Sequence, residues 1–205
     1  MKFNKDIFVN PLSKGNPILV LVLGICSALA VTAQVRPALV MGISVTVVTA
    51  FSNVILSMIR NSIPNRIRII VQLVVIAALV IIVEQVLKAY AYEMWKQLSV
   101  FIGLIITNCI LMGRLEAFAL ANKPFDSFVD GIANGLGYML VLLAVSVARE
   151  SLGSGTILGF SIVPQFLFDH GYSNNGLMIL PPMALIVVAC IIWVHRSMNR
   201  DLQEK

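Results

Sequence analysis

Two cysteines in matching places of the two halves of the chain are the residues best suited to carry chemistry. Cys26 lies in the short apolar stretch 18–32, and Cys109 lies in the short apolar stretch 98–113. A cysteine in an apolar segment can simply fill space, or its thiolate can bind a metal or an iron–sulfur cluster. Such clusters need four ligands, usually thiolates, and both histidines lie outside the apolar runs. The two cysteines could therefore form only half of a cluster site, and a second chain would have to complete it.

Two acidic residues lie inside or at the edge of apolar segments, where ionisable side chains are functional candidates. Glu84 precedes Lys88 by one helical turn, so it could form an i,i+4 ion pair or bind a cation. Asp130 stands where an apolar segment begins, so it could cap a helix as a first-turn acid or bind a cation. Glu84 and Asp130 are therefore the candidates for an ion pathway.

Other reactive or charged residues have simpler interpretations. Cys190 is alone in the last apolar segment and is expected to pack as a small apolar side chain. Glu116 after Arg114, and Glu150 directly after Arg149, are expected to compensate those charges at helix ends.

The composition indicates an integral membrane protein that forms a single domain over residues 1–205. The 205-residue chain is 59% hydrophobic and 12% charged, whereas soluble domains have about 25% charged residues. The formal net charge of +5 is more typical of cytoplasmic loops of a membrane protein than of a nucleic-acid-binding protein, so no nucleic acid is expected. Three cysteines, all in apolar segments, argue against a disulfide framework.

The apolar runs predict an all-α fold with six transmembrane helices, because a helical crossing needs about 20 apolar residues. The run 151–168 is rejected because three glycines and a proline interrupt it. The six predicted segments are 15–35, 37–59, 69–83 (reaching 87 with Glu84 inside), 97–113, 131–148 and 171–194. An alternative for the first segment is a cleavable signal peptide ending near Ala28-Leu29-Ala30. Asp6, two Asn-Pro pairs and the length of the preceding segment argue against it.

The distribution of Lys and Arg predicts that both termini are cytoplasmic. Eleven of the fifteen basic residues fall in one set of loops and four in the other. The four are Arg36, Lys88, Lys96 and Arg149. The loop from Arg149 to Gly176 is the longest, and its aromatic-rich part (Phe160, Phe166, Phe168, Tyr172) is expected on the extracytoplasmic surface.

Six crossings divide into two three-helix halves, about 1–95 and 96–205. An odd number of crossings per half makes the second half an inverted repeat of the first, and such repeats often place a site where short or broken helices correspond. Segments 1 and 4 correspond in this way, with Gly24 just before Cys26 and Thr107-Asn108 just before Cys109. Half-helices that meet near the midplane would bring the two thiols together.

The second and fifth segments carry residues suited to close helix packing. Gly131 and Gly135 have the spacing of a small-xxx-small face. The second segment has a polar stripe: Thr46, Thr49, Asn53 and Ser57. Both features favour helix–helix contact, with the lining of an ion path as the alternative. The sequence has no dinucleotide fingerprint, P-loop or HExxH motif, and Ser154-Gly155-Thr156 is better explained as a glycine-rich turn than as a flavin-attachment site. The chain alone is therefore not expected to bind NADH, ATP or a covalent flavin.

Several motifs together resemble one family of membrane subunits. The segments 24–32, 63–72, 84–90, 103–110, 114–118, 130–138 and 175–178 are similar to the D subunits of Na+-translocating NADH:quinone oxidoreductases, within the NqrDE/RnfAE family. The related E subunits of Rnf complexes usually have Cys-Pro where this chain has Cys26-Ser27, which favours the Nqr branch. The resemblance covers essentially the whole chain.

The resemblance implies a [2Fe–2S] cluster held by two cysteines from each of two subunits, which here would be Cys26 and Cys109. It implies a homologous E subunit in the opposite orientation as partner, with the A, B, C and F subunits in the same complex of the bacterial inner membrane. NADH, FAD, FMN and riboflavin would then belong to other subunits, and Na+ would be the transported ion. Similar chains often have Asp at the position of Glu84, so the longer side chain here puts the ion geometry in doubt.

Three functions are therefore compared. The first is an electron-relay subunit of such a translocase, with an Rnf-type subunit as its close variant. The second is a secondary ion transporter built on an inverted repeat, which would work alone and without iron. The third is a passive scaffold, in which both cysteines could be replaced without loss of electron transfer.

Overall fold

The fold was analysed in a computed structural model, which describes residues 16–64, 66–157, 160–161 and 176–198. The first half contains α2 (Ile25–Val31), α3 (Val35–Ile59), the 3-10 turn η2 (Arg60–Ser62) and α4 (Arg68–Tyr90). The second half contains α5 (Tyr92–Ile106), α6 (Cys109–Arg114), the π-helical turn η3 (Leu115–Ala119) and α7 (Pro124–Gly153). It ends with β1 (Thr156–Ile157), β2 (Phe160–Ser161), the 3-10 turn η4 (Gly176–Ile179) and α9 (Pro181–Met198).

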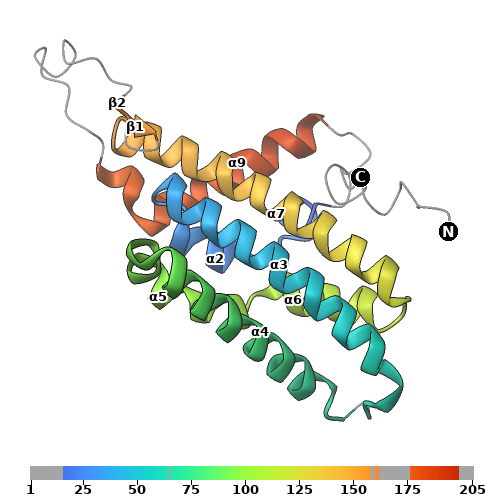
Figure 1. The fold of residues 1–205 in the computed structure, drawn as a ribbon. Coiled ribbons are helices and arrows are strands. Elements are labelled where there is room, and N and C mark those ends of the chain that lie inside the picture. The colour runs from blue at the N-terminus through green and yellow to red at the C-terminus, as the bar shows by residue number, and fades with distance from the viewer. Residues whose placement is uncertain (1–15, 65, 158–159, 162–175, 199–205) are drawn as a thin grey trace, which may run out of the picture.

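The long helices α3 and α7 form the centre of the bundle, and they run side by side in opposite directions (Figure 1). The small-xxx-small face predicted on α7 makes this contact. A Cβ atom added to Gly131 would lie 2.7 Å from the Ala50 Cα atom, and one added to Gly135 would lie 2.7 Å from the Thr46 Cα atom. The two backbones can approach this closely only because both positions lack a side chain.

The polar stripe of α3 also serves this contact, as the first of its two interpretations predicted. Asn53 Nδ2 donates to the Ser127 carbonyl at 3.0 Å, and Ser57 Oγ donates to the Asn122 carbonyl at 2.7 Å. Thr49 is fully buried and donates to the Val45 carbonyl of its own helix at 2.6 Å. These bonds satisfy polar groups that would otherwise be costly inside an apolar bundle.

Five helical stretches of the described residues are long and apolar enough to cross a membrane: Val35–Ile59, Arg68–Tyr90, Ser99–Ala119, Pro124–Gly153 and Pro181–Met198. The predicted first segment is different, because residues 17–21 form turns and only the seven residues of α2 are helical. Six crossings therefore stay a prediction. The regular elements of the described residues are helical apart from two antiparallel two-residue strands, in which Thr156 pairs with Ser161.

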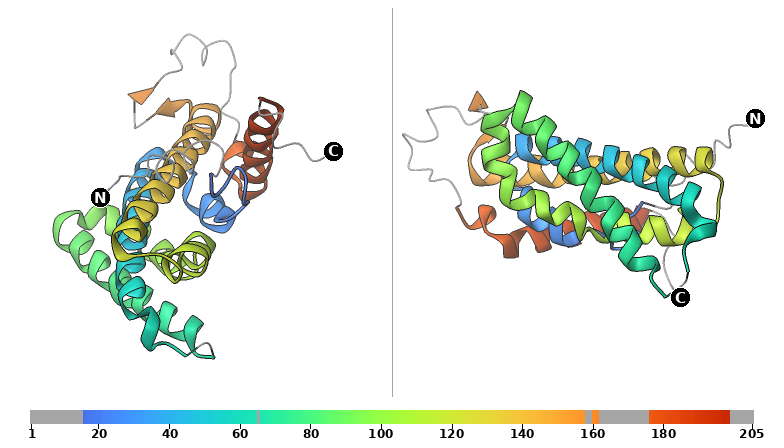
Figure 2. Two further views of the ribbon diagram at one scale, coloured as in Figure 1. Left: turned by 90° about the vertical axis from the view of Figure 1, so that its right-hand side faces the viewer. Right: turned by 60° about the horizontal axis from the view of Figure 1, so that its bottom comes forward.

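The outer helices leave much apolar surface uncovered. The described buried residues of α4 are Gln72, Ile76 and Val80, and those of α9 are Ala184 and Val188. Figure 2 shows α4 and α9 at the periphery, on different sides of the α3–α7 pair. Exposed apolar helix surface of this extent is what lipid or neighbouring subunits cover in a membrane protein.

The prediction for the fifth segment and its following loop was wrong at both ends. The helix α7 begins at Pro124, not at residue 131, and reaches Gly153, so Arg149 belongs to the helix and not to the following loop. Its polar residues were mistaken for loop because they face protein: Arg149 is only 1% exposed. Its guanidinium donates to Thr32 Oγ1 at 2.7 Å and to the carbonyls of Met178 and Ile179 at 3.1 and 2.6 Å.

Glu150 does not compensate Arg149. Its Oε2 atom accepts from the backbone N–H of Val35 at 2.6 Å, at the first residue of α3, where a carboxylate is favoured by the helix dipole. The glycine-rich turn predicted after α7 is present, since Ser154 ends the helix and Gly155 has a φ of 66°. The aromatic residues Phe166, Phe168 and Tyr172 lie outside the described residues.

Candidate functional site

The first cysteine lies at the start of the short helix α2. Gly24 precedes this helix with a φ of 81°, a left-handed conformation that favours glycine. A Cβ atom there would also lie 2.6 Å from Ile110 Cδ1. Val22, two residues earlier, has a φ of 57°, which is strained for a β-branched residue. The chain therefore turns sharply just before Cys26, which is the second residue of α2.

The second cysteine lies at an equivalent break in the fourth segment. The helix α5 ends at Ile106, Thr107 leaves the helical path, and α6 begins at Cys109. Asn108 caps α6, because its Oδ1 atom accepts from the N–H of Ile110 at 3.1 Å. The interruption predicted at Thr107-Asn108 is therefore present, and it places Cys109 in the first turn of a new helix.

Hydrogen bonds join the two breaks directly. Asn108 Nδ2 donates to Ser27 Oγ at 3.3 Å, and Ser27 Oγ donates to the Gly24 carbonyl at 3.0 Å. Tyr138, which is fully buried on α7, places its hydroxyl 2.5 Å from Ser27 Oγ. Since the Ser27 hydroxyl donates its single proton to the Gly24 carbonyl, Tyr138 is the donor in the bond between the two hydroxyl groups. This network fixes the start of α2 against the start of α6 and against the central helix.

The network places Cys26 and Cys109 beside the same small depression. Its remaining lining comes from Gly24, Ser27, Leu104, Thr107 and Asn108. Its volume is about 20 Å³, roughly the room that one water molecule needs. Both cysteines are exposed on the surface of the chain. The chain therefore brings the two thiols together but cannot enclose a cluster between them, and anything they bind would also face outward.

The number of possible ligands in the structure also indicates that this chain alone does not complete a metal site. No group of three or more His, Cys, Asp or Glu side chains that could hold a metal occurs among the described residues. The residues present fit half of a four-thiolate site, because two exposed thiols line one depression and a buried polar network fixes the breaks that carry them. Cys190 is also exposed, on α9, and does not line this depression.

Sequence analysis missed part of this site. Asn108 stands directly before Cys109, so its capping role could have been recognised from its residue type and position. The sequence at Ser27 distinguishes two branches of a family, but it gives no sign that the Ser27 hydroxyl is the centre of the network. Tyr138 gave no signal, because only the folded structure places α7 behind both breaks.

Asp130 is held by a basic side chain, and it is not a helix cap. It lies in the second turn of α7, where Arg114 Nε donates to its Oδ2 atom at 3.1 Å and the Arg114 Nη2 atom forms an ion pair with Oδ1. Asn134 Nδ2 also donates to Oδ1 at 2.9 Å. Arg114 was expected to pair with Glu116, which instead forms an ion pair with Arg68 and accepts from Gln72.

Glu84 and Lys88 do not form the i,i+4 ion pair that was one of the expectations. Trp95 lies between them: its Nε1 atom donates to Glu84 Oε1 at 3.3 Å, and the Lys88 ammonium lies 5.1 Å from its ring centroid. This is a cation–π contact, which holds the lysine while the carboxylate accepts from the indole. Glu84 and Asp130 thus have different surroundings, and they lie on different helices.

The exchange Asp130→Asn is expected to destabilise the protein by about 3 kcal/mol, because it leaves the largely buried Arg114 guanidinium without its carboxylate. For a chain of this length that is a fall of about 10 °C in the unfolding temperature in detergent. Glu84→Gln is the matched control, since glutamine keeps an oxygen that can accept from Trp95, and it should shift the midpoint by less than about 3 °C. Equal shifts for both variants would contradict this account of the Arg114–Asp130 pair.

The family model described as "Rnf-Nqr subunit, membrane protein" matches residues 4–192. The chain belongs to the Rnf-Nqr family. The matched range contains every described helix and strand except the last turns of α9, which ends at Met198.

Curated relatives within the Rnf-Nqr family match almost the full length of the chain. A protein of Aeromonas salmonicida is 58% identical over 193 residues, covering 94% of this chain and 92% of its own. Proteins of Haemophilus influenzae and Pseudomonas aeruginosa are each 54% identical and cover 98% of this chain, with 97% and 89% of their own lengths. All three are named as the D subunit of a Na(+)-translocating NADH-quinone reductase. These relatives are therefore subunits of a translocase complex.

Proposed function

We propose that this chain is a membrane subunit of a Na+-translocating NADH–quinone reductase and that Cys26 and Cys109 are its two ligands to a shared [2Fe–2S] cluster. The observation that carries the proposal is the convergence of the two thiols on one opening, from breaks 83 residues apart in sequence. The names of the relatives support the translocase, and they favour it over an Rnf complex. When bound, such a cluster supplies a one-electron acceptor and donor.

Other residues of this chain would hold the two cysteines in fixed positions. Ser27, Asn108 and Tyr138 hold the two breaks in register, so the thiols are placed before any metal arrives. The Cys-Pro sequence typical of Rnf E subunits could not make these bonds, because proline has no hydroxyl group. The exposure of both thiols suits a site completed by two cysteines of a second chain. We expect that second chain to be a homologous E subunit.

The arrangement of the two halves supports an inverted repeat. Each half has a broken segment with a cysteine after the break, then a long central helix (α3 or α7), then an outer helix (α4 or α9). The two central helices are antiparallel, as inversion requires (Figure 1). Single cysteines introduced as Arg36→Cys and Phe125→Cys, at the starts of α3 and α7, should then react with an impermeant thiol reagent from opposite sides of the membrane. Labelling of both from one side would exclude inversion.

An ion pathway near Asp130 is a second role with support in the structure. Three buried oxygen atoms near this residue have no hydrogen-bond partner within the described part of the chain: Asn53 Oδ1, Ser127 Oγ and Asn134 Oδ1. Oxygen atoms of this kind are ligands for hard cations. Arg114 occupies the carboxylate, so Na+ could use it only if this ion pair opened. Glu84 is the weaker candidate, since its oxygen already accepts from Trp95.

The test of the electron-relay function is turnover of the assembled complex with Cys26→Ser, Cys109→Ser and, as control, Cys190→Ser. NADH–quinone turnover should fall at least about a hundredfold for the first two. Replacing a residue that only hydrogen-bonds to a metal ligand typically lowers activity about 10–100-fold, and replacing the ligand itself should lower it further. The control should retain the wild-type rate. Full activity in the first two variants would favour the scaffold, and ion transport by the chain alone without iron would favour a secondary transporter.

A further inference from the structure

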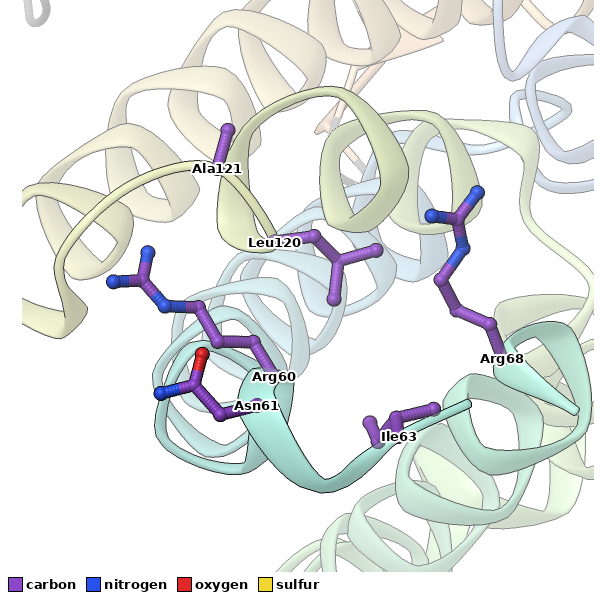
Figure 3. Close-up of a pocket in the computed structure, with 6 residues that line it drawn as sticks. All are labelled: Arg60, Asn61, Ile63, Arg68, Leu120 and Ala121. Carbon is purple, nitrogen blue, oxygen red and sulfur yellow. The ribbon is translucent and has the colours of Figure 1, made fainter. Parts of the chain in front are cut away.

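A hollow lined by two arginines lies at the end of the bundle opposite to Arg149. Its volume is about 400 Å³, and its lining comes from three segments of the chain: η2 with the following Ile63, the start of α4 and the residues after η3. Figure 3 shows the lining residues Arg60, Asn61, Ile63, Arg68, Leu120 and Ala121, with the two guanidinium groups on opposite sides of Leu120. No acidic side chain is among them. The hollow thus has a basic character that neither the cysteine site nor the ion pathway uses.

Each arginine retains unused donors in the fold. Arg60 Nη1 donates to the Asn122 carbonyl at 2.8 Å, and Arg68 Nη2 pairs with Glu116. A guanidinium has five N–H donors, so these contacts anchor the two side chains and leave further donors for a ligand. Glu116 is the one acidic partner of this pair of arginines in the described contacts, so the two cations are not fully compensated.

The start of α4 adds a second feature that favours an anion. Arg68 is the first residue of this 23-residue helix, and no side chain caps it. The first N–H groups of a helix lack partners within the helix, and together with its dipole they attract phosphate and other anions. The uncapped helix start and both arginines border one hollow, which is an arrangement suited to a phosphate group.

The surroundings indicate an amphiphile rather than a soluble anion. The hollow lies between the end of α3 and the start of α4, two helices long and apolar enough to span a membrane. The ends of such helices lie at the depth of the lipid head groups. Large apolar side chains next to its two arginines in the sequence are exposed: Met58 and Ile59 at the end of α3, and Ile67 and Ile69 at the start of α4. Acyl chains could cover these side chains while the phosphate group occupies the hollow. Basic pockets between membrane helices commonly bind anionic head groups.

We propose that this hollow binds the phosphate group of an anionic phospholipid, with Arg60 and Arg68 as the main ligands. The exposed Arg66 lies in the same loop but does not line the hollow, so it provides a matched control of equal charge. This site is separate from the cysteines and from Asp130.

The test is lipid binding to the delipidated whole complex, measured by native mass spectrometry with phosphatidylglycerol, phosphatidylcholine and inorganic phosphate as probes. Phosphatidylglycerol should bind more tightly than phosphatidylcholine. Arg60→Gln and Arg68→Gln should each weaken it about fivefold, as one lost cation near the membrane surface does, while Arg66→Gln changes it less than about twofold. Arg60→Lys and Arg68→Lys keep the charge and should lose less than the glutamine variants.

Three results would overturn the proposal. The first is no difference between the Arg66 variant and the two lining variants. The second is equal binding of phosphatidylcholine and phosphatidylglycerol, which would remove the role of net negative charge. The third is inorganic phosphate that binds as tightly as phosphatidylglycerol, which would assign the hollow to a soluble anion. If a glutamine variant fails to assemble, its lysine counterpart decides: it should bind phosphatidylglycerol more weakly than the wild type, because lysine lacks the forked donors of arginine, and binding equal to that of the wild type would overturn the role of that arginine.

Discussion

The complex carrying Cys109→Ala is expected to lose the [2Fe–2S] absorption of this one site and about two iron atoms per complex, while its subunits stay together. Cys109 is exposed and fills no space in the core, so its replacement removes a sulfur without creating a cavity. The break itself is held by Asn108, Ser27 and Tyr138, which the variant retains. Cys26→Ala should have the same effect, since neither thiol has a substitute nearby.

The matched control for the cysteine variants is Cys190→Ala, which removes an equally exposed thiol on a different helix. Its visible spectrum and iron content should equal those of the wild type, after correction for the iron of other subunits. Iron that persists in both Cys26→Ala and Cys109→Ala would contradict the assignment of these residues as ligands. A loss of iron that also appears in Cys190→Ala would indicate general damage to the complex.

Gly135→Leu is expected to prevent correct folding, because the new side chain would have to enter the contact between α3 and α7. Even its Cβ atom would lie 2.7 Å from the Cα and Oγ1 atoms of Thr46. The obstacle is backbone, so the two helices would have to separate, which costs more than the 1–3 kcal/mol typical of overpacking in an adaptable core. Size-exclusion profiles and thermal unfolding in detergent measure the effect, with Gly135→Ala as the milder variant.

Gly103→Leu is the control for this packing prediction, because no heavy atom lies within 4 Å of a Cβ atom placed there. It should fold as the wild type does, and it could gain up to about 1 kcal/mol from the better helix propensity of leucine. A well-folded Gly135→Leu protein would show that α3 and α7 do not pack through this face.

The sequence allowed prediction of features that depend on local residue types. The two breaks were predictable because glycine often interrupts a helix and asparagine often caps one. Gly24 lies two positions before Cys26, and Asn108 lies directly before Cys109. The close packing of α7 was predictable because the four-residue spacing of Gly131 and Gly135 places both on one helix face. Both predictions depend only on residues that are close together in the sequence.

Features that depend on distant partners could not be predicted from the sequence. A charge usually ends an apolar run, so the sequence predicts a loop at Arg149, yet this residue lies in α7 and its guanidinium donates to Thr32 and to two carbonyls before α9. Glu116 was paired with its neighbour in sequence, whereas its partner Arg68 is 48 residues away. Tyr138 was overlooked for the same reason. In each case a polar group inside the bundle is satisfied by a contact between elements, and the sequence does not identify the other element.

Cys26 and Cys109 are proposed to form half of a cluster site. The most direct test is to measure iron in the chain purified alone and in the chain purified with its partner subunit. Reconstitution with iron and sulfide under anaerobic conditions, followed by Mössbauer spectroscopy and iron counting, measures both samples in the same way. The account predicts about two iron atoms per pair with the signature of a [2Fe–2S] cluster and no stable cluster in the chain alone. A stable cluster in the isolated chain, or an iron-free pair that still supports electron transfer, would contradict it.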